Sequence, residues 1–360
     1  MLSEPASLIY IERAVAALPY TQMVLQNFPG ARLELIDNLR AVVAPAQAYP
    51  LAPPKQAQPL ILARQRGRFL KKCPGTKEHI CCNYHTLNIA VGCPYDCTYC
   101  FLQSYSNTPF YTIYTNLDEM LAEIKSQVKG KIRLGTGELT DSLAMERRTH
   151  FVREYVPQIC AISPEITLEL KTKSNWTLGE DEASLLAQFR SQLVFAWSVN
   201  PQDLIDSDEY GTAPLLERIH AAQTAAASGY RVALHFDPII YGQDWAERYQ
   251  VVLDLLKVNI PPEQIAWLSL GTFRFTPALK PIVERRFPDS TLVYGELFPG
   301  RDRKMRYPEP IRVKIYRQLL KQIAAISPRI PVYLCMESPE VWQKVYNRLP
   351  RQVENLSELF

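Results

Sequence analysis

Three cysteines in one short segment are the residues whose types and spacing point most directly to chemistry. The segment reads Val91-Gly92-Cys93-Pro94-Tyr95-Asp96-Cys97-Thr98-Tyr99-Cys100-Phe101, with the spacing C-x3-C-x2-C. Three thiolates on one tight loop can bind three irons of a [4Fe–4S] cubane and leave the fourth open, whereas electron-transfer clusters usually take four thiolates. We therefore expect Cys93, Cys97 and Cys100 to be metal ligands. Zinc, which favours paired C-x2–4-C motifs and a fourth ligand, is the main alternative, and three ordinary buried cysteines are the other.

A second group of cysteines precedes this motif. Six of the eight cysteines lie between residues 73 and 100, and Cys73, Cys81 and Cys82 are those outside the motif. They are open to three interpretations: ligands of a second cluster, with Cys335 as a fourth ligand; a hydrogen-atom donor; or small buried apolar residues. A disulfide framework is not expected, because a cytosolic compartment keeps thiols reduced.

The elements that must position the motif form an alternation of strands and helices that begins near Thr86. Short apolar strands are expected at 86–91, 131–135, 166–171, 193–198, 231–236 and 265–270. Amphipathic helices are expected at 117–128, 182–189, 215–228 and 245–258. Strands separated by helices predict a parallel sheet. The fold class is therefore α/β, a partial (β/α)6 barrel of the TIM type, with its chemistry at the carboxyl ends of the strands.

Three parts of the chain are expected. Residues 1–60 form an appendage of strand, helix and strand (8–12, 19–28 and 32–36) followed by a proline-rich linker, since each proline fixes φ and removes a donor. Residues 61–290 form the barrel, and residues 291–360 form a basic, aromatic and helical extension.

Composition limits the function classes. The net charge is only +3, so any nucleic-acid partner must be argued from local patches. No apolar run reaches the roughly 18 residues of a membrane span, and no signal sequence is seen at the N-terminus. We expect a cytoplasmic protein with no membrane partner. The oligomeric state is not indicated.

The cysteine motif resembles that of the radical S-adenosylmethionine superfamily. This resemblance implies a [4Fe–4S] cluster, S-adenosylmethionine as cofactor, an external electron donor of the flavodoxin or ferredoxin type, and a 5′-deoxyadenosyl radical. Gly135-Thr136-Gly137-Glu138 resembles the superfamily's Gly-Gly-Glu element, whose carboxylate meets the methionine ammonium. The cofactor contacts that it implies are Gly135, Gly137, Glu138, Lys173, Ser198 and Asn200, and the catalytic residues are Tyr99 and Glu138.

A closer resemblance, to the spore photoproduct lyase family, extends over some 270 residues in ordered blocks. The blocks are Leu8–Glu12, Cys100-Phe101-Leu102-Gln103, Thr172-Lys173, Ser198-Val199-Asn200, Tyr210–Leu215 with Arg218-Ile219, Ala226–Tyr230, Asp237–Tyr241 and Phe273–Thr276. The family reverses an ultraviolet lesion in DNA in which the methyl carbon of one thymine is bonded to its neighbour. We therefore expect a radical lyase that repairs a pyrimidine lesion.

This sequence departs from the family at the residue that returns hydrogen. The family's donor cysteine follows the second barrel strand, but here that run is Gly137-Glu138-Leu139-Thr140-Asp141. Of the two aromatic residues that flank the last cluster cysteine, the second is Phe101, without a hydroxyl. Two other hypotheses are therefore kept. One is a radical enzyme acting on RNA, a peptide or a small molecule; the other is an iron–sulfur protein that binds nucleic acid without catalysis.

Basic and aromatic residues crowd a segment near residue 300. The resemblance places a basic hairpin here that enters the lesion, and DNA is the expected partner. Cations for phosphates and aromatic rings for displaced bases suit the recognition of a flipped base. The expected nucleic-acid contacts are Arg301, Arg303, Lys304, Arg306 and Tyr307.

Overall fold

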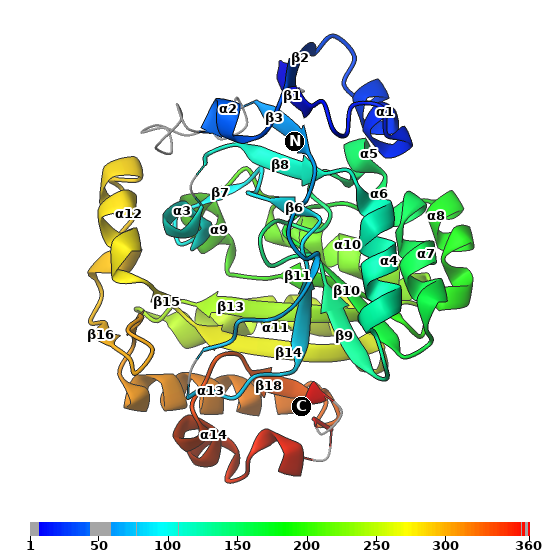
Figure 1. Cartoon of the computed structure of the whole chain (residues 1–360). Helices are drawn as coiled ribbons and strands as arrows, with labels where there is room; N and C mark the ends of the chain where they lie inside the picture. Colours follow the sequence, from blue (N-terminus) through cyan, green and yellow to red (C-terminus); the bar gives the residue numbers. More distant parts are fainter. Residues whose placement is uncertain (1–6, 44–58, 77, 107, 354, 357–358) are drawn as a thin grey trace.

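A computed structural model describes residues 7–43, 59–76, 78–106, 108–353, 355–356 and 359–360. Most of the predicted proline-rich linker (44–58) lies outside the described residues. A large curled sheet occupies the centre of the molecule, with a smaller sheet at one end and two C-terminal helices at the other (Figure 1). None of the described helices combines the length and the apolar character needed to cross a membrane.

The central sheet has eight strands, seven of them parallel and in sequence order. The parallel strands are β5 (Tyr84–Leu87), β9 (Ile132–Gly135), β10 (Ile166–Thr172), β11 (Leu193–Ser198), β13 (Arg231–Ile239), β14 (Ile265–Thr272) and β18 (Val332–Leu334); β4 (Leu70–Lys72) adds an antiparallel edge. Parallel neighbours need crossover connections, which the intervening helices supply. The strands therefore point their carboxyl ends toward one rim, as predicted for a partial barrel.

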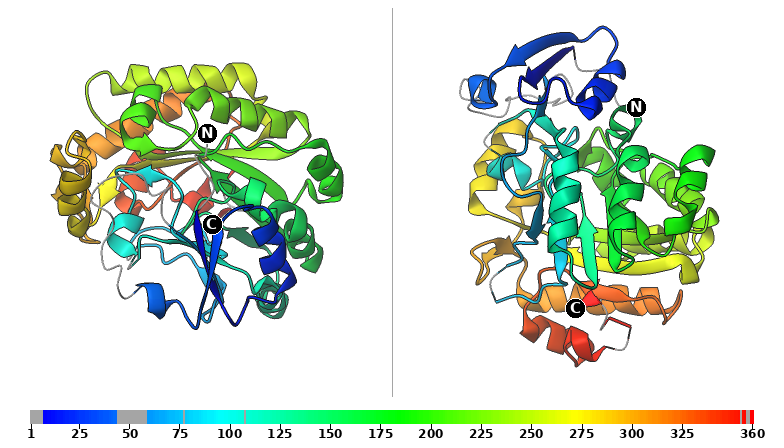
Figure 2. Two further views of the ribbon diagram at one scale, coloured as in Figure 1. Left: turned by 90° about the horizontal axis from the view of Figure 1, so that it is seen from above. Right: turned by 45° about the vertical axis from the view of Figure 1, so that its right-hand side comes forward.

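Helices cover the outer face of this sheet (Figure 2). The helices between or after the parallel strands are α4 (Leu117–Gln127), α5 (Glu146–Thr149), α6 (Phe151–Glu154), α7 (Val156–Ile162), α8 (Glu180–Leu185), α9 (Gln202–Asp208), α10 (Leu215–Ala227), α11 (Trp245–Asn259) and α13 (Glu309–Ala324). The short 3-10 turns are η2 (Ala187–Phe189), η3 (Pro262–Gln264), η4 (Pro277–Leu279), η5 (Leu292–Tyr294) and η6 (Pro350–Gln352). Strand β14 is buried along its whole length, which explains its continuous apolar sequence.

One expected strand differs from the structure, and the C-terminal part holds a strand that was not expected. The expected first strand, 86–91, is two strands, because the chain leaves the barrel after β5 and adds β6 (Ala90–Val91) to the smaller sheet. The C-terminal extension, expected to be basic and helical, also holds the seventh parallel strand, β18. Strand β18 has only three residues, too few to be recognised in the sequence. It is identified as a strand by its pairing with β14.

The smaller sheet confirms the predicted strand–helix–strand appendage. Its order is β2-β1-β3-β8-β6, with α1 (Pro19–Gln26) between the first two strands in sequence. The strands are β1 (Leu8–Glu12), β2 (Arg32–Ile36), β3 (Leu60–Ala63) and β8 (Tyr111–Tyr114), and α2 (Arg40–Val43) follows β2. Because β6 belongs to this sheet, the smaller sheet fixes the start of the cysteine segment.

The C-terminal part contains the expected basic hairpin. Strands β16 (Phe298–Pro299) and β17 (Met305–Arg306) pair antiparallel, and β17 also pairs with β15 (Arg274–Phe275), which follows β14. Helices α12 (Lys280–Arg286) and α14 (Pro339–Tyr346) flank this region. The hairpin is thereby joined to the rim of the barrel.

Candidate active site

The cysteine segment is a loop held at both ends by short strand pairs. Gly92 precedes it with φ +89°, and a Cβ there would lie 3.0 Å from the carbonyl oxygen of Phe110, so only glycine fits. Further on, β7 (Asp96–Cys97) pairs antiparallel with β12 (Glu209–Tyr210). This pairing places Cys97 opposite Glu209, a residue more than a hundred positions away in the sequence.

A buried ion pair locks the loop in place. Asp96 accepts two bonds from the Arg286 guanidinium of α12, at 3.0 and 2.6 Å. Arg286 also donates to the Gln103 side chain, whose amide in turn donates to the carbonyls of Cys97 and Thr98 at 2.7 and 3.0 Å. Gln103 lies in α3 (Leu102–Tyr105) directly after the third cysteine. These bonds fix the backbone between the second and third cysteines.

The donor set of the loop fits a cubane. Cys97 is buried, while Cys93 and Cys100 are half-buried, and all three pack with Tyr95. Burial raises the pKa of the free Cys97 thiol well above its ordinary value, with Lys173 acting in the opposite direction; bound metal would deprotonate it. Among the described residues, no three His, Cys, Asp or Glu side chains gather as ligands of a single ion. A cubane does not require such a gathering, because each thiolate binds a different iron and the fourth iron is left open.

Three of the predicted site residues meet at one carboxylate. Glu209 is fully buried and accepts bonds at one oxygen from Lys173 Nζ (3.0 Å), Asn200 Nδ2 (2.8 Å) and the hydroxyl of Tyr99. Its other oxygen accepts from Arg218 Nη2 at 2.6 Å. Burial alone would raise the pKa of Glu209, but the Arg218 and Lys173 charges outweigh it and hold the pKa well below its usual range. The site thus keeps a permanent carboxylate beside Cys97.

The remaining predicted contacts lie around this centre. Ser198 ends β11, and its carbonyl accepts from Arg218 Nη1 at 3.0 Å. Glu138 follows β9 and lies near Lys171, whose pKa is lowered by burial but raised overall by Glu138 and other carboxylates. No contact among the described residues joins Glu138 to Lys173.

The two predicted cofactor glycines have packing reasons of their own. A Cβ on Gly135 would lie 1.6 Å from the hydroxyl of Tyr84 on the neighbouring strand. A Cβ on Gly137 would lie 3.1 Å from Ser142 Oγ and 3.2 Å from the carbonyl oxygen of Lys171. Gly135 is therefore required by the packing of Tyr84, whereas a side chain at Gly137 would need its neighbours to shift by a few tenths of an ångström.

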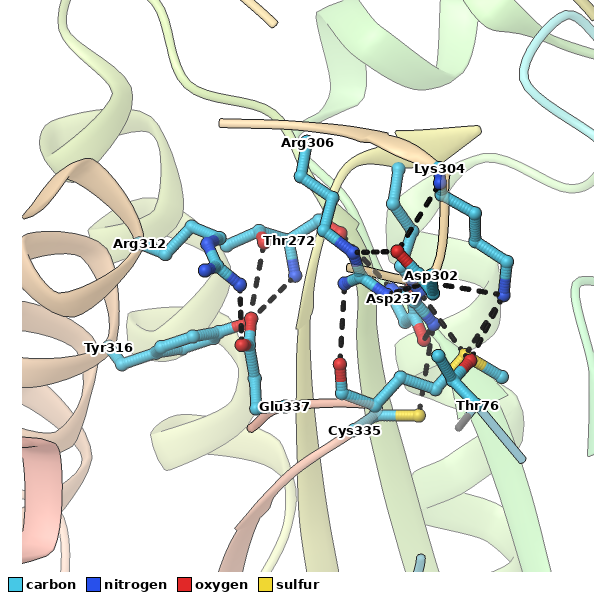
Figure 3. A network of polar contacts seen from close by, with 12 residues as sticks. Thr76, Asp237, Thr272, Asp302, Lys304, Arg306, Arg312, Tyr316, Cys335 and Glu337 are labelled. Atoms are coloured by element: carbon cyan, nitrogen blue, oxygen red, sulfur yellow. Dashed lines mark hydrogen bonds and ion pairs between the residues drawn. The ribbon is translucent and has the colours of Figure 1, made fainter. Parts of the chain in front are cut away.

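The hairpin residues divide into exposed and buried members, and Figure 3 shows two of them, Lys304 and Arg306, with the residues that they contact. Arg301 and Arg303 are exposed, and Arg301 pairs with Glu340 at 3.2 Å. Lys304 turns inward, where its Nζ lies 3.2 Å from Thr76 Oγ1 and 3.8 Å from Met336 Sδ. The hairpin thus contacts the segment that carries the second cysteine group.

Arg306 and Tyr307 are correctly placed in the hairpin region but are not available to nucleic acid. Arg306 is buried and paired with Asp302 at 2.5 and 3.1 Å. The Tyr307 ring is buried, and its hydroxyl accepts from the backbone N–H of Tyr241 at 3.1 Å. Both side chains stabilise the hairpin base, so we withdraw them as expected DNA contacts.

Comparison with known proteins identifies the group to which these features belong. The model of the family described as spore photoproduct lyase matches residues 77–324. The chain belongs to the spore photoproduct lyase family. This is a family of radical S-adenosylmethionine lyases, so the resemblance seen in the cysteine motif and the ordered blocks is confirmed.

Relatives and solved structures agree with this membership. The spore photoproduct lyase of Bacillus subtilis (strain 168) is 26% identical over 219 residues, 59% of this chain and 63% of that protein, less than two thirds of its length. That of Geobacillus sp. (strain Y412MC61) is 25% identical over 303 residues, 80% and 84% of the two chains. A solved spore photoproduct lyase complexed with dinucleoside spore photoproduct has a TM-score of 0.75 at 21% identity, covering 91% of this chain and 98% of that one. A mutant of the enzyme with bound AdoMet and dinucleoside spore photoproduct gives 0.76 at 19% identity, covering 93% and 99%. The partial barrel is the fold of these structures.

Sequence analysis missed four residues that hold the site together: Asp96, Glu209, Arg218 and Arg286. Asp96 lies within the cysteine motif, and Arg218 lies in one of the family blocks. Both residues were therefore noted in the sequence, but nothing there gave them a structural role. Glu209 directly precedes the family block that starts at Tyr210, and this position was the one available signal. Arg286 had none, because its partner is 190 residues away.

Proposed function

We propose that this chain is a radical S-adenosylmethionine lyase that reverses a pyrimidine lesion in DNA. The observation that carries the proposal is the cysteine loop, in which three thiols share one loop locked by the Asp96–Arg286 pair. Membership of the spore photoproduct lyase family supports the same reaction class.

Cys93, Cys97 and Cys100 would hold the [4Fe–4S] cluster in this proposal. When bound, the cluster and S-adenosylmethionine supply a 5′-deoxyadenosyl radical that removes a hydrogen atom from the substrate. Lys173 has three donor hydrogens and two acceptors in the structure, Tyr99 and Glu209, so one hydrogen remains for the cofactor's carboxylate. Glu138, which follows the adjacent strand β9, is proposed to accept from the cofactor's ammonium group.

Tyr99 is proposed to be the catalytic phenol of the site. Burial raises the pKa of its hydroxyl well above the ordinary value, with the Glu209 charge adding to the rise, so the phenol stays protonated at neutral pH. Its hydroxyl donates to the permanent carboxylate of Glu209, which holds the phenol hydrogen and fixes the orientation of the ring. Asn200, bonded to Glu209 and to Tyr249, holds that carboxylate in position.

The proposal also includes the partners and the location. DNA is the substrate, a flavodoxin or ferredoxin type of protein is the low-potential electron donor, and the location is cytoplasmic. Arg301 and Arg303 are the exposed hairpin cations proposed to meet phosphates. The names of the related proteins and of their complexes point to spore photoproduct as the lesion to test first.

The direct test is anaerobic incubation of reconstituted protein with S-adenosylmethionine, reductant and ultraviolet-irradiated DNA, followed by mass spectrometry of nucleosides. We expect lesions to disappear and 5′-deoxyadenosine to form. The Cys97→Ala variant should lose both the ~400 nm cluster absorption and 5′-deoxyadenosine. Formation of 5′-deoxyadenosine without any change in irradiated DNA would instead favour a substrate that is RNA, a peptide or a small molecule.

A further inference from the structure

The concave side of the central sheet carries a cluster of charged side chains that the proposed reaction does not yet use. Arg133 of β9 lies over the rings of Trp267 on β14 and Tyr333 on β18, with 4.9 and 5.4 Å from the guanidinium carbon to the ring centroids. Three strands separate β9 from β14 in the sheet, so these contacts can form only inside the curl. Arg133 Nε also lies 3.9 Å from Glu169 Oε2 on β10. These side chains therefore face the interior of the barrel.

His235 of β13 belongs to the same interior cluster. Its Nε2 lies 2.6 Å from Glu169 Oε1, although β11 runs between the two strands. Burial lowers the pKa of His235 while Glu169 opposes the fall, so the imidazole is neutral at pH 7. Because an ionised carboxylate can only accept, Nε2 carries the hydrogen and Nδ1 keeps its lone pair. Among the described residues, Nδ1 has no hydrogen-bond partner.

Two further polar groups of this interior lack a partner in the described part of the chain. Lys171 follows Glu169 by two residues, so it lies on the same face of β10 and nearer the carboxyl rim. No hydrogen bond or ion pair joins its ammonium group to a described residue. Ser269 pairs in register with His235 and lies on the same face of β14 as Trp267. Its hydroxyl is buried without a hydrogen-bond partner.

The cluster lies next to both parts of the proposed active site. A Cβ on Gly137 would lie 3.2 Å from the Cβ of Lys171, and Glu138, the proposed ammonium acceptor, is the next residue. Asp237 of β13 and Lys304 of the hairpin belong to one polar network (Figure 3). The Asp237 side chain is 25% exposed and Lys171 is half-buried, so a ligand can reach this level of the barrel.

Donors and acceptors alternate across this interior. In strand order, the groups without partners are the ammonium of Lys171 on β10, the lone pair of His235 Nδ1 on β13 and the hydroxyl of Ser269 on β14. The first is a donor, the second an acceptor, and the third can donate. The imide edge of thymine presents the complementary series of carbonyl, N–H and carbonyl. Cytosine presents an amine, a lone pair and a carbonyl, which would set donor against donor and acceptor against acceptor at the first two positions.

We infer that Lys171, His235 and Ser269 determine the specificity of the lyase by binding the imide edge of the extruded pyrimidine; this inference rests on the proposed function. Lys171 and Ser269 donate to the two ring carbonyl oxygens, and His235 Nδ1 accepts from the N3–H group between them. Enzymes that act on an extruded base commonly read it through this edge. Glu169 is a positioning residue, because its contact with Nε2 fixes the tautomer that leaves Nδ1 free to accept.

The first experiment changes the ligand and leaves the protein intact. Dinucleoside spore photoproduct is titrated anaerobically into the reconstituted protein with S-adenosylmethionine and without reductant, so that no turnover occurs. Two derivatives, each methylated at N3 of one of the two rings, are titrated in the same way. At least one derivative should bind about tenfold more weakly, since a methyl group replaces the hydrogen that His235 accepts. Equal affinity for the dinucleoside and both derivatives would overturn the inference.

The second experiment connects this loss of affinity to the residues. His235→Gln keeps a donor for Glu169 but has no acceptor at the Nδ1 position, so it should bind the dinucleoside more weakly and no longer distinguish the methylated derivative. Lys171→Met keeps the length of the side chain without its donor, and its affinity should fall about tenfold. His220→Gln on α10 and Lys257→Met on α11, both at exposed positions, are the matched controls and should bind as the parent does.

The outcomes separate the inference from the proposed function. A methylation penalty that persists in His235→Gln, or parent affinity in Lys171→Met, would contradict the inference alone if the parent repairs the lesion. A parent that binds neither the dinucleoside nor irradiated DNA and repairs no lesion would contradict the proposed function, and the recognition of the imide edge with it.

Discussion

At the scale of single residues, the site depends on buried charges that are matched in pairs. Asp96 and Arg286 are 3% and 0% exposed at their side chains, and Glu209 and Arg218 are both 0% exposed. Such pairs are not strong sources of stability, but removal of one partner leaves an uncompensated buried charge. Their value here is positional, because each one fixes a strand or loop that carries a proposed ligand.

We expect Asp96→Ala to lower the free energy of unfolding by about 3–5 kcal/mol, because it strands the buried Arg286 guanidinium. Cluster content after reconstitution should fall with it. Denaturant unfolding and iron analysis measure the two effects. The exposed Asp37, which pairs with Arg13 at 3.0 Å, is the control, and Asp37→Ala should cost less than about 1 kcal/mol. Equal costs for the two variants would contradict the role given to Asp96.

Glu146 gives a prediction about pH. Burial raises its pKa to about 8, although backbone bonds from Val152 and Phe151 oppose the rise. An unfolded glutamate releases its proton near pH 4.3. Between these values the folded chain binds more protons, so stability falls as the pH rises from about 4.5 to about 8.

The Glu146→Gln variant should remove this loss. Between pH 5 and pH 8 the parent should lose on the order of 1–4 kcal/mol relative to the variant. Denaturant titrations at several pH values measure it, with the exposed Glu263→Gln as control. Parallel pH profiles for the parent and Glu146→Gln would show that the carboxyl ionises normally.

At the scale of elements, the hairpin of β16 and β17 combines a buried base with an exposed tip. Arg306 and Tyr307 form the base, and Arg301 and Arg303 lie in the tip. The stretch therefore has two roles: its interior residues hold it against the barrel, and only its exposed cations can meet a phosphate.

We expect Arg303→Ala to reduce the slope of log K for DNA binding against log salt by about one, because one phosphate contact is lost. Arg306→Ala should instead destabilise the fold, since Asp302 would lose its buried partner. Fluorescence anisotropy at several salt concentrations measures the slope. Arg348→Ala, at an exposed arginine after α14, should leave the slope unchanged. An unchanged slope in Arg303→Ala would remove the tip from the interface.

At the scale of the whole molecule, the C-terminal segment closes the side of the partial barrel. Strand β18 extends the sheet beyond β14, and Asn83 donates to the Phe360 carbonyl oxygen at 2.6 Å. Trp342 of α14 is fully buried. Its ring is stacked on Tyr346 with 5.2 Å between the ring centroids, and it lies edge-on to Phe360 at 5.5 Å. Through the bond from Asn83, this packing holds the segment that carries Cys73, Cys81 and Cys82 against the barrel.

We expect Trp342→Ala to cost about 3–5 kcal/mol of unfolding free energy, as for other large core truncations. The thiols of Cys73, Cys81 and Cys82 should also react faster with an alkylating reagent. Denaturant unfolding and timed alkylation with peptide mapping measure the two effects. Tyr105→Ala removes an aromatic ring that is 66% exposed and should change stability by about 0.5 kcal/mol or less. Loss of stability without faster alkylation would mean that the segment is held by other contacts.

The sequence by itself determined the features that are encoded locally. The cysteine spacing, the apolar strands and the ordered blocks all lie within short runs, and they predicted the barrel, the family and the convergence of Tyr99, Lys173 and Asn200 on one region. Only the tertiary structure decided which partners these residues meet. Glu209 is 110 residues from Tyr99, and Arg286 is 190 from Asp96. Strand β18 is too short to be recognised without β14 beside it. Such pairings depend on how the sheet curls and closes, which no local pattern records. The same closure buries Arg306 and Tyr307 and brings Thr76, close to the second cysteine group in the chain, against Lys304 of the hairpin.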